Sequence, residues 1–260
     1  MIHTGLVSVT FRKLKPIQIV KLVSLAQLEG IEWGGDVHVP HGDIDTAREV
    51  YKQTVESGLS VTSYGSYYRM DTEDKNLDDF KKVLDTALEL HAPMIRVWAG
   101  NKGSASADEN WWRHIINISR KIGDMAGKVN IAISYEYHGN TLTDTNGSAL
   151  RLLKEVGHNN IKSYWQPPVN MSFKERIAGL KNILPYLTNV HVFRWVTHAS
   201  KIERRPLKSG MDEWGAYLNV VSDDGHDHNA MIEFVKDDDT RQFMEDANVL
   251  KKLVKECTNV

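Results

Sequence analysis

Four residues that can bind a metal stand at or near the ends of short apolar runs in the second half of the chain. They are Glu136, Gln166, His191 and Glu233. The intervals between them match the length of a strand–helix–strand crossover, so parallel strands would bring them to one rim. Two carboxylates, an imidazole and an amide oxygen suit one divalent cation, such as Mn²⁺, Mg²⁺, Co²⁺ or Zn²⁺. The absence of thiolate ligands argues against a structural zinc site.

Each of these residues also has an ordinary interpretation. His191 alone is more often a hydrogen-bonded histidine than a ligand, and Glu136 could form an ion pair with Lys162 or Arg194. The spacing of the four residues by itself leaves both interpretations open.

The segment 131–138 illustrates how a strand would present such a group. Side chains alternate between the two faces of a strand, so Ala132, Ser134 and Glu136 share one face. The other face is bulky and apolar. This pattern is typical of a barrel strand that packs outward on helices and opens into a site at its C-terminal end.

Strand-like and helical patterns alternate along the whole chain. Strands are expected at residues 5–10, 30–33, 59–64, 93–98, 129–135, 161–165, 190–193 and 230–234. Helices are expected at residues 16–28, from Asp43 or Asp45 to about 57, and at 76–90, 108–126, 148–156, 173–184, 211–221 and 240–256. Eight such units predict an α/β fold, a single (β/α)8 TIM barrel over residues 1–260. A doubly wound sheet is less favoured, because no Gly-x-Gly-x-x-Gly follows the first strand.

Aromatic side chains also gather at the expected strand ends. Tyr64, Trp98 and Trp195 could pack the rim of the barrel, or they could form walls that stack on the C–H faces of a sugar. A basic segment with Lys201, Arg204, Arg205 and Lys208 follows the seventh strand. It is either a solvated loop or a contact for a phosphate or carboxylate.

The composition narrows the class of protein. The chain has 260 residues and a formal net charge of −2, which gives no field that favours nucleic acid. Its single cysteine, Cys257, fits a reducing compartment. No signal peptide or membrane-length apolar run is visible. We therefore expect a soluble, cytoplasmic protein that binds neither nucleic acid nor membrane.

Five motifs together resemble the xylose isomerase-like barrels of the sugar phosphate isomerase/epimerase superfamily, which also contains endonuclease IV. The motifs occupy residues 30–38, 63–69, 136–138, 191–193 and 232–233. The resemblance implies one divalent metal held by Glu136, Gln166, His191 and Glu233, with Glu136 and Glu233 as catalytic acid and base. It also implies that His38, His138 and Arg194 bind substrate hydroxyls, beside the aromatic Tyr64, Trp98 and Trp195.

The implied reaction is proton transfer next to a carbonyl. The metal polarises the carbonyl, one glutamate removes the proton, and the other returns it. The substrate would be a sugar, a ketose or a sugar phosphate, and the product an epimer or isomer. The chain departs from the family at Gln166 and Val169, where aspartate and histidine are usual. It departs again at Arg194 and Trp195, where a Lys-Asp pair is usual.

Three alternatives remain beside the isomerase/epimerase. The same carboxylates could expel water from an inositol-type ketone, as in a dehydratase. A non-catalytic barrel could bind a polyol. An endonuclease IV-like nuclease is less favoured, because it needs more histidine ligands and a basic groove. The sequence leaves open the sugar, the metal and whether the chain forms a homo-oligomer.

Overall fold

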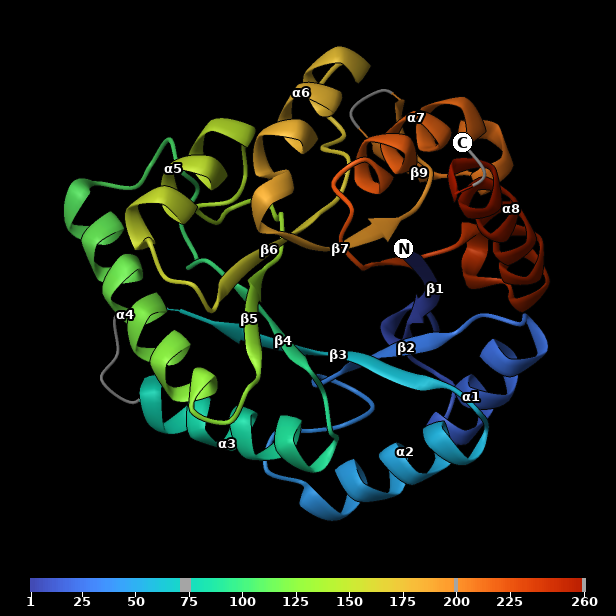
Figure 1. Cartoon of the computed structure of the whole chain (residues 1–260), viewed down its shortest axis with the longest axis horizontal. Coiled ribbons are helices and arrows are strands. Elements are labelled where there is room, and N and C mark those ends of the chain that lie inside the picture. The colour runs from blue at the N-terminus through green and yellow to red at the C-terminus, as the bar shows by residue number, and fades with distance from the viewer. Residues whose placement is uncertain (71–75, 199–200, 259–260) are drawn as a thin grey trace.

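The computed structural model describes residues 1–260 except 71–75, 199–200 and 259–260. Eight parallel strands close into a barrel in the order β1-β10-β7-β6-β5-β4-β3-β2. Figure 1 shows the helices as an outer ring around these strands. The strands are β1 (Ile2–Val7), β2 (Gly30–Gly34), β3 (Ser60–Arg69), β4 (Met94–Trp98), β5 (Ala132–Tyr135), β6 (Ile161–Trp165), β7 (Leu187–Val192) and β10 (His228–Ile232). The predicted (β/α)8 barrel is confirmed.

Several helices begin after a residue whose side chain satisfies a free backbone N–H group. Asp43 accepts from Thr46 N and Asp108 accepts from Trp111 N, so each caps the helix that follows. The helices are α1 (Pro16–Leu25), α2 (Ile44–Glu56), α3 (Asn76–Glu89), α4 (Glu109–Gly127), α5 (Asn146–Val156), α6 (Phe173–Ile183), α7 (Met211–Ser222) and α8 (Thr240–Thr258). Over the described residues, these helices include none with the length and apolar character needed to cross a membrane.

The two faces of β5 behave as the alternation predicts. Tyr135 points outward, where its hydroxyl donates to Ser119 Oγ on α4. Ser134 points into the barrel, where its hydroxyl lies 3.0 Å from Thr188 Oγ1 on β7. The outward faces therefore form the core between strands and helices, and the inward faces can carry polar groups.

The bounds of several strands differ from the prediction, most notably those of the first and third strands. The first strand covers residues 2–7 instead of 5–10, and Ser8–Phe11 forms a 3-10 turn, η1. Ser8 Oγ accepts a hydrogen bond from Gly34 N of β2, so this polar residue is used to turn the chain over the barrel. The third strand extends beyond Tyr64 to Arg69, with an irregularity between Gly65 and Tyr68.

The segment after β7 forms a hairpin that the sequence analysis treated as a loop. β8 (Trp195–His198) pairs antiparallel with β9 (Lys201–Arg204). Among the described residues, the two strands of this hairpin pair only with each other, and the side chains of β9 are mostly exposed. It therefore lacks the alternation of apolar residues that identifies a half-buried strand.

Candidate metal centre

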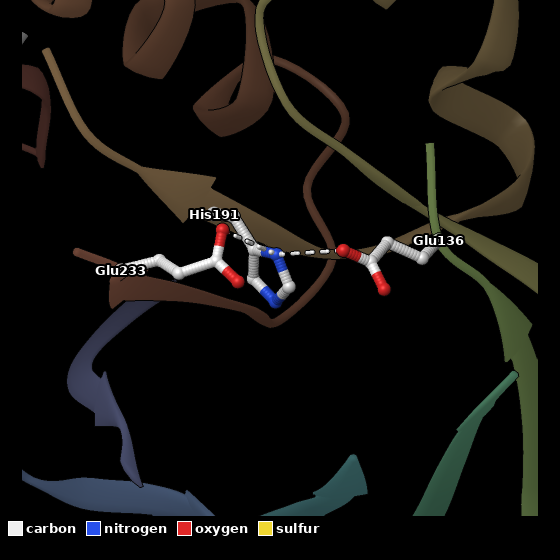
Figure 2. A group of neighbouring side chains, drawn as sticks. All are labelled: Glu136, His191 and Glu233. Atoms are coloured by element: carbon white, nitrogen blue, oxygen red, sulfur yellow. Dashed lines mark ion pairs between the residues drawn. The ribbon is translucent and has the colours of Figure 1, made fainter. Parts of the chain in front are cut away.

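Glu136, His191 and Glu233 converge inside the C-terminal end of the barrel. Glu136 directly follows β5, His191 lies on β7, and Glu233 directly follows β10. Their ligand atoms all lie within 4.8 Å of one another, and all three residues are buried. Figure 2 shows the two carboxylates on either side of the imidazole. His191 Nδ1 is 3.4 Å from a Glu233 oxygen and 4.0 Å from Glu136 Oε1.

The amide of Gln166 is oriented toward this triad. Its Nε2 donates to the Tyr137 carbonyl at 2.7 Å, which leaves Oε1 at 3.1 Å from His191 Nδ1. An amide oxygen is a suitable ligand for a hard cation. The structure thus brings together all four residues predicted as metal ligands.

The chemistry of this donor set fits a divalent cation. His191 Nε2 is buried without a hydrogen-bond partner, and a Glu32 oxygen lies 3.6 Å from it. A neutral imidazole with its proton on Nε2, facing this carboxylate, keeps the Nδ1 lone pair for a metal. Three carboxylates, those of Glu32, Glu136 and Glu233, lie around His191. One guanidinium, that of Arg96, pairs with the first two of them. A divalent cation would balance the two excess negative charges.

Without a metal, a proton takes its place. Burial opposes a charge on the imidazole, but the carboxylates of Glu233 and Glu32 outweigh it and raise the pKa of His191 to about 10. The imidazole is therefore protonated at neutral pH until a metal binds. Proton and metal compete for the same nitrogen.

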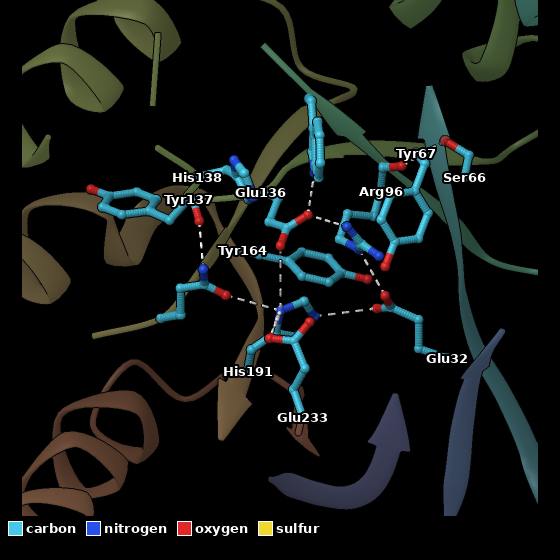
Figure 3. Close-up of polar contacts among 12 residues, drawn as sticks. Glu32, Ser66, Tyr67, Arg96, Glu136, Tyr137, His138, Tyr164, His191 and Glu233 are labelled. Atoms are coloured by element: carbon cyan, nitrogen blue, oxygen red, sulfur yellow. Dashed lines mark hydrogen bonds and ion pairs between the residues drawn. The ribbon is translucent and has the colours of Figure 1, made fainter. Parts of the chain in front are cut away.

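Glu32 and Arg96 form a buried ion pair beside the triad, shown in Figure 3. Arg96 Nε donates to Glu32 Oε1 at 2.7 Å, and its Nη1 donates to Glu136 Oε2. Burial alone raises the pKa of the Glu32 carboxyl, yet Arg96 and His191 hold it well below its usual range. Ser63 Oγ also donates to Glu32, at 2.9 Å. The Arg96 guanidinium therefore connects Glu136, a predicted metal ligand, with Glu32, the carboxylate that faces His191.

The sequence analysis assigned no role to Glu32 or Arg96. A signal was nevertheless present, because each is a charged residue inside a short apolar strand. Such a residue is rarely buried unless it is paired. An acid and a base in this setting on different strands are candidates to pair with each other.

A cavity of about 490 Å³ opens beside the triad. Its polar lining includes Glu136, His138, Gln166 and Glu233, and its apolar lining includes Pro168, Val169, Phe193, Trp195 and Phe234. His138 and Trp195, both predicted to bind substrate, are therefore in this lining. Trp98 stacks on His138 with ring centroids 4.1 Å apart, and its Nε1 donates to Glu136 Oε2.

Three other predicted substrate contacts make internal hydrogen bonds instead. His38 lies against Ser8 Oγ and the Leu14 carbonyl, and Tyr64 donates to the Val39 carbonyl at 2.6 Å. Arg194 donates to Glu213 at 2.8 Å. The structure does not bring these three into the lining of the cavity, and their contact with substrate stays a prediction.

The basic segment after β7 is compensated by acids. Arg204 pairs with Asp238 at 2.6 Å, and Arg205 pairs with Glu203 at 2.7 Å. Both arginines therefore have carboxylate partners within the chain. The solvated interpretation of this segment accounts for them without a bound anion.

The comparison with family models identifies the class. Residues 20–253 match the model described as a xylose isomerase-like TIM barrel. The chain therefore belongs to the xylose isomerase-like TIM barrel family, as the five motifs predicted.

Individual relatives are distant but nearly full-length. A 3-dehydroshikimate dehydratase from Bacillus anthracis is 24% identical over 88% of this chain and 90% of its own. Among solved structures, a probable 3-DHS dehydratase from Bacillus anthracis gives a TM-score of 0.82 at 22% identity, covering 96% of this chain and 99% of that one. An L-ribulose 3-epimerase gives 0.78 at 13% identity, covering 100% and 96%. A Mycobacterium smegmatis barrel, solved in complex with magnesium, gives 0.76 at 17% identity, covering 98% and 97%. At these identities the structural matches establish the fold alone.

Proposed function

We propose that this protein is a divalent-metal-dependent dehydratase that removes water from a cyclic β-hydroxy ketone. The observation that carries the proposal concerns Glu136. Its Oε2 accepts hydrogen bonds from both Arg96 and Trp98, and its Oε1 faces His191. Oε2 of Glu136 thus already accepts two hydrogen bonds, and Oε1 is needed as a metal ligand. We therefore assign Glu136 the role of a ligand, which leaves the predicted acid–base pair without one member.

His138 is the base in this proposal. Its Nδ1 lies 2.7 Å from the Gly139 carbonyl, which can only accept a hydrogen bond. The proton therefore sits on Nδ1, and Nε2 carries a free lone pair. The imidazole lines the same cavity as Glu136 and Glu233, and its stacking on Trp98 fixes the plane of the ring. An imidazole whose free Nε2 faces the cavity in a fixed plane is suited to general base catalysis.

The elimination needs no redox partner. A divalent metal held by Glu136, Gln166, His191 and Glu233 would supply positive charge that stabilises the negative charge developing on the carbonyl oxygen. His138 Nε2 takes the proton from the carbon next to the carbonyl, and a carbon–carbon double bond forms as the bond to the β-hydroxyl oxygen breaks. The departing oxygen takes up that proton and leaves as water. His138 thus removes the proton from carbon and then returns it to the departing oxygen.

The comparisons support a dehydratase over the isomerase/epimerase that the sequence analysis ranked first. The relative named as a 3-dehydroshikimate dehydratase aligns over nearly the full length of both chains. Its identity of 24% is too low to transfer a substrate, so the proposal names a reaction class and leaves the ring substituents open.

Epimerisation of a ketose is the second candidate, and Glu233 is the observation that favours it. Its carboxylate pairs with His191 and lies on the opposite side of the imidazole from Glu136. A second base on that side could return the proton to the other face of the substrate. Solved relatives named L-ribulose 3-epimerase and D-psicose 3-epimerase share the fold.

The two candidates differ in their products. We would incubate Mn²⁺-loaded protein with 3-dehydroshikimate, with uncharged cyclic β-hydroxy ketones and with ketoses in D₂O, and follow the mixtures by NMR. Dehydration yields a new alkene or aromatic signal. Epimerisation yields deuterium next to an intact ketone. Deuterium exchange with no alkene would reject the dehydratase in favour of the epimerase.

A variant tests the base directly. We expect His138→Asn to lower kcat about 10²- to 10³-fold with little change in Mn²⁺ affinity, because general base catalysis contributes about that much. His226→Asn is the matched control, since this exposed histidine precedes β10 at the opposite end of the barrel. Full activity in His138→Asn would remove this residue from the mechanism.

A further inference from the structure

The cavity beside the triad is acidic, and its described lining offers no lysine or arginine to compensate the acids. Its lining contains three carboxylates, from Glu136, Asp144 and Glu233. None of the described residues that line it is a lysine or an arginine. A divalent metal would balance Glu136 and Glu233 and leave no positive charge over for a ligand.

Four arginines at the C-terminal side of the barrel are already paired with acids. Arg96 lies between Glu32 and Glu136, and each of three others has one acidic partner: Arg12 with Asp36, Arg194 with Glu213, and Arg204 with Asp238. A ligand anion would have to break one of these pairs to gain a guanidinium. An anionic substituent is therefore opposed by the unbalanced carboxylate of Asp144 and gains no free cation among these groups.

One wall of the cavity is aromatic. Phe193 and Trp195 stack with centroids 4.2 Å apart, and Phe234 packs on Trp195 at 5.9 Å. Ile202 of the hairpin extends this wall, and its side chain is 55% exposed. Trp195 Nε1 is buried without a hydrogen-bond partner. The wall offers an apolar face with a single donor, which suits a planar or apolar group.

We propose that the substrate is an uncharged hydroxy ketone whose ring, or a substituent on it, presents an apolar or aromatic face to Phe193, Trp195 and Phe234. This inference rests on the proposed function only for the position of the reacting carbonyl at the metal centre. A cavity of about 490 Å³ lies in the range of sites that bury drug-sized ligands. It has room for a ring and an apolar substituent, and its described lining offers no lysine or arginine to a phosphate or carboxylate.

Two unreactive aromatic diols isolate the effect of charge. Catechol and 3,4-dihydroxybenzoate share the pair of oxygens that can approach a metal, and they differ by one carboxylate. We would measure both by calorimetry on Mn²⁺-loaded protein. We expect catechol to bind at least tenfold more tightly. Equal binding, or tighter binding of the carboxylate, would overturn the inference.

Variants of the wall test its role. A lysine introduced by Val169→Lys or Phe193→Lys should reverse the preference and tighten 3,4-dihydroxybenzoate at least tenfold. Ile17→Lys, a similar change on α1 outside the cavity, should leave both affinities unchanged. Phe193 is buried, so the half-buried Val169 keeps the test valid if Phe193→Lys does not fold. An unchanged preference in Val169→Lys would mean that the diols bind elsewhere.

Removing one ring of the aromatic wall tests whether the wall contacts the ligand. Trp195→Ala should weaken catechol at least fivefold, because the ring loses its stacking partner. Unchanged catechol binding would exclude the aromatic wall as the contact surface. The binding and turnover results test the two proposals separately. If the neutral diols bind but no ketone is turned over, only the dehydratase proposal is rejected. Efficient turnover of anionic 3-dehydroshikimate would reject only the uncharged substrate.

Discussion

The two nitrogens of His191 face different partners, and this difference decides which of them is available to a metal. Nδ1 faces Glu136, Gln166 and Glu233, whereas Nε2 faces Glu32. Carboxylates behind metal-binding histidines fix the tautomer and raise the basicity of the ligand nitrogen. Glu32 is therefore a positioning residue that acts through His191.

Replacing Glu32 by glutamine should weaken metal binding. Glu32→Gln keeps the shape of the side chain but removes the negative charge that holds the proton on Nε2. We expect Mn²⁺ affinity to fall about 10- to 100-fold. Calorimetry on metal-stripped protein measures it, with the surface change Glu49→Gln as control. An unchanged dissociation constant would mean that Glu32 serves only to neutralise Arg96.

The triad itself is tested by direct titration. Wild-type protein should bind one Mn²⁺ per chain, and Glu136→Gln and His191→Ala should each lose this binding while retaining their circular dichroism spectra. Both variants remove a ligand from the group of atoms within 4.8 Å. Binding that is indifferent to both changes would show that the cluster holds no metal.

The four ligand candidates could be predicted because they stand near strand ends with crossover spacing, and the fold converts that spacing into proximity. His38, Tyr64 and Arg194 have similar positions in the sequence, yet they use their polar atoms inside the protein. Sequence position shows that a side chain lies near the rim of the barrel. It does not show whether a nearby carbonyl or carboxylate already satisfies that side chain.

At the scale of elements, β3 must come close to the buried ion pair. A Cβ atom added to Gly65 would lie 2.6 Å from Arg96 Nη2 and 2.7 Å from Glu32 Oε1. We expect Gly65→Ala to lower the free energy of unfolding by about 1–3 kcal/mol, because a well-packed core cannot absorb the extra methyl group. It should also weaken Mn²⁺ binding.

Urea denaturation checks the Gly65 prediction. Gly147→Ala is the matched control, since nothing lies within 4 Å of its added Cβ. That change should be neutral or slightly stabilising in α5. Equal stabilities of the two variants would show that the barrel tolerates a side chain at position 65.

The contact between α8 and the turn η3 (Leu207–Gly210) makes stability depend on pH. Asp246 of α8 accepts from Leu207 N at 2.8 Å, and burial raises the pKa of its carboxyl to about 6. Because this pKa lies above that of an exposed aspartate, 3.8, the protonated form favours the folded state. Its contribution is full below about pH 4 and is lost as the pH rises through about 6.

Asp246→Asn should remove this dependence. The amide oxygen can still accept from Leu207 N, but no charge is buried. We expect the variant to exceed wild type in free energy of unfolding by about 1–2 kcal/mol at pH 7.5, after allowance for solvent screening. The difference should disappear near pH 4. A difference that is constant between pH 4 and 7.5 would exclude ionisation of Asp246 as its cause.

Most elements could be predicted because burial on the barrel imposes a clear period on them. The hairpin of β8 and β9 could not, because its strands pair with each other at the surface. The end of β1 could not either, because Ser8 and Thr10 are polar residues buried by specific hydrogen bonds. Neither the hairpin nor the end of β1 therefore shows the alternating apolar residues from which a strand is predicted.

On the scale of the whole molecule, charge argues against a nucleic-acid substrate. The formal net charge is −2, and Arg12, Arg96, Arg194 and Arg204 are paired with acids. DNA binding depends on cations that replace the counterions of the phosphates. We expect Mn²⁺- or Zn²⁺-loaded protein neither to bind nor to cut a duplex with an abasic site at about 0.15 M salt. Metal-dependent incision in that assay would reopen the nuclease interpretation.

The ion pair between Arg96 and its two glutamates also bears on how the barrel can be divided. Arg96 and Glu32 belong to the first four strands, whereas Glu136 and His191 belong to the last four. A fragment that ends after β4 would retain the Arg96–Glu32 pair but lose the Glu136 and His191 groups that cover it. The complementary fragment would expose an unbalanced cluster of carboxylates. The two halves of this barrel are thus electrostatically incomplete, and the chain should fold as one cooperative unit and not as two independent halves.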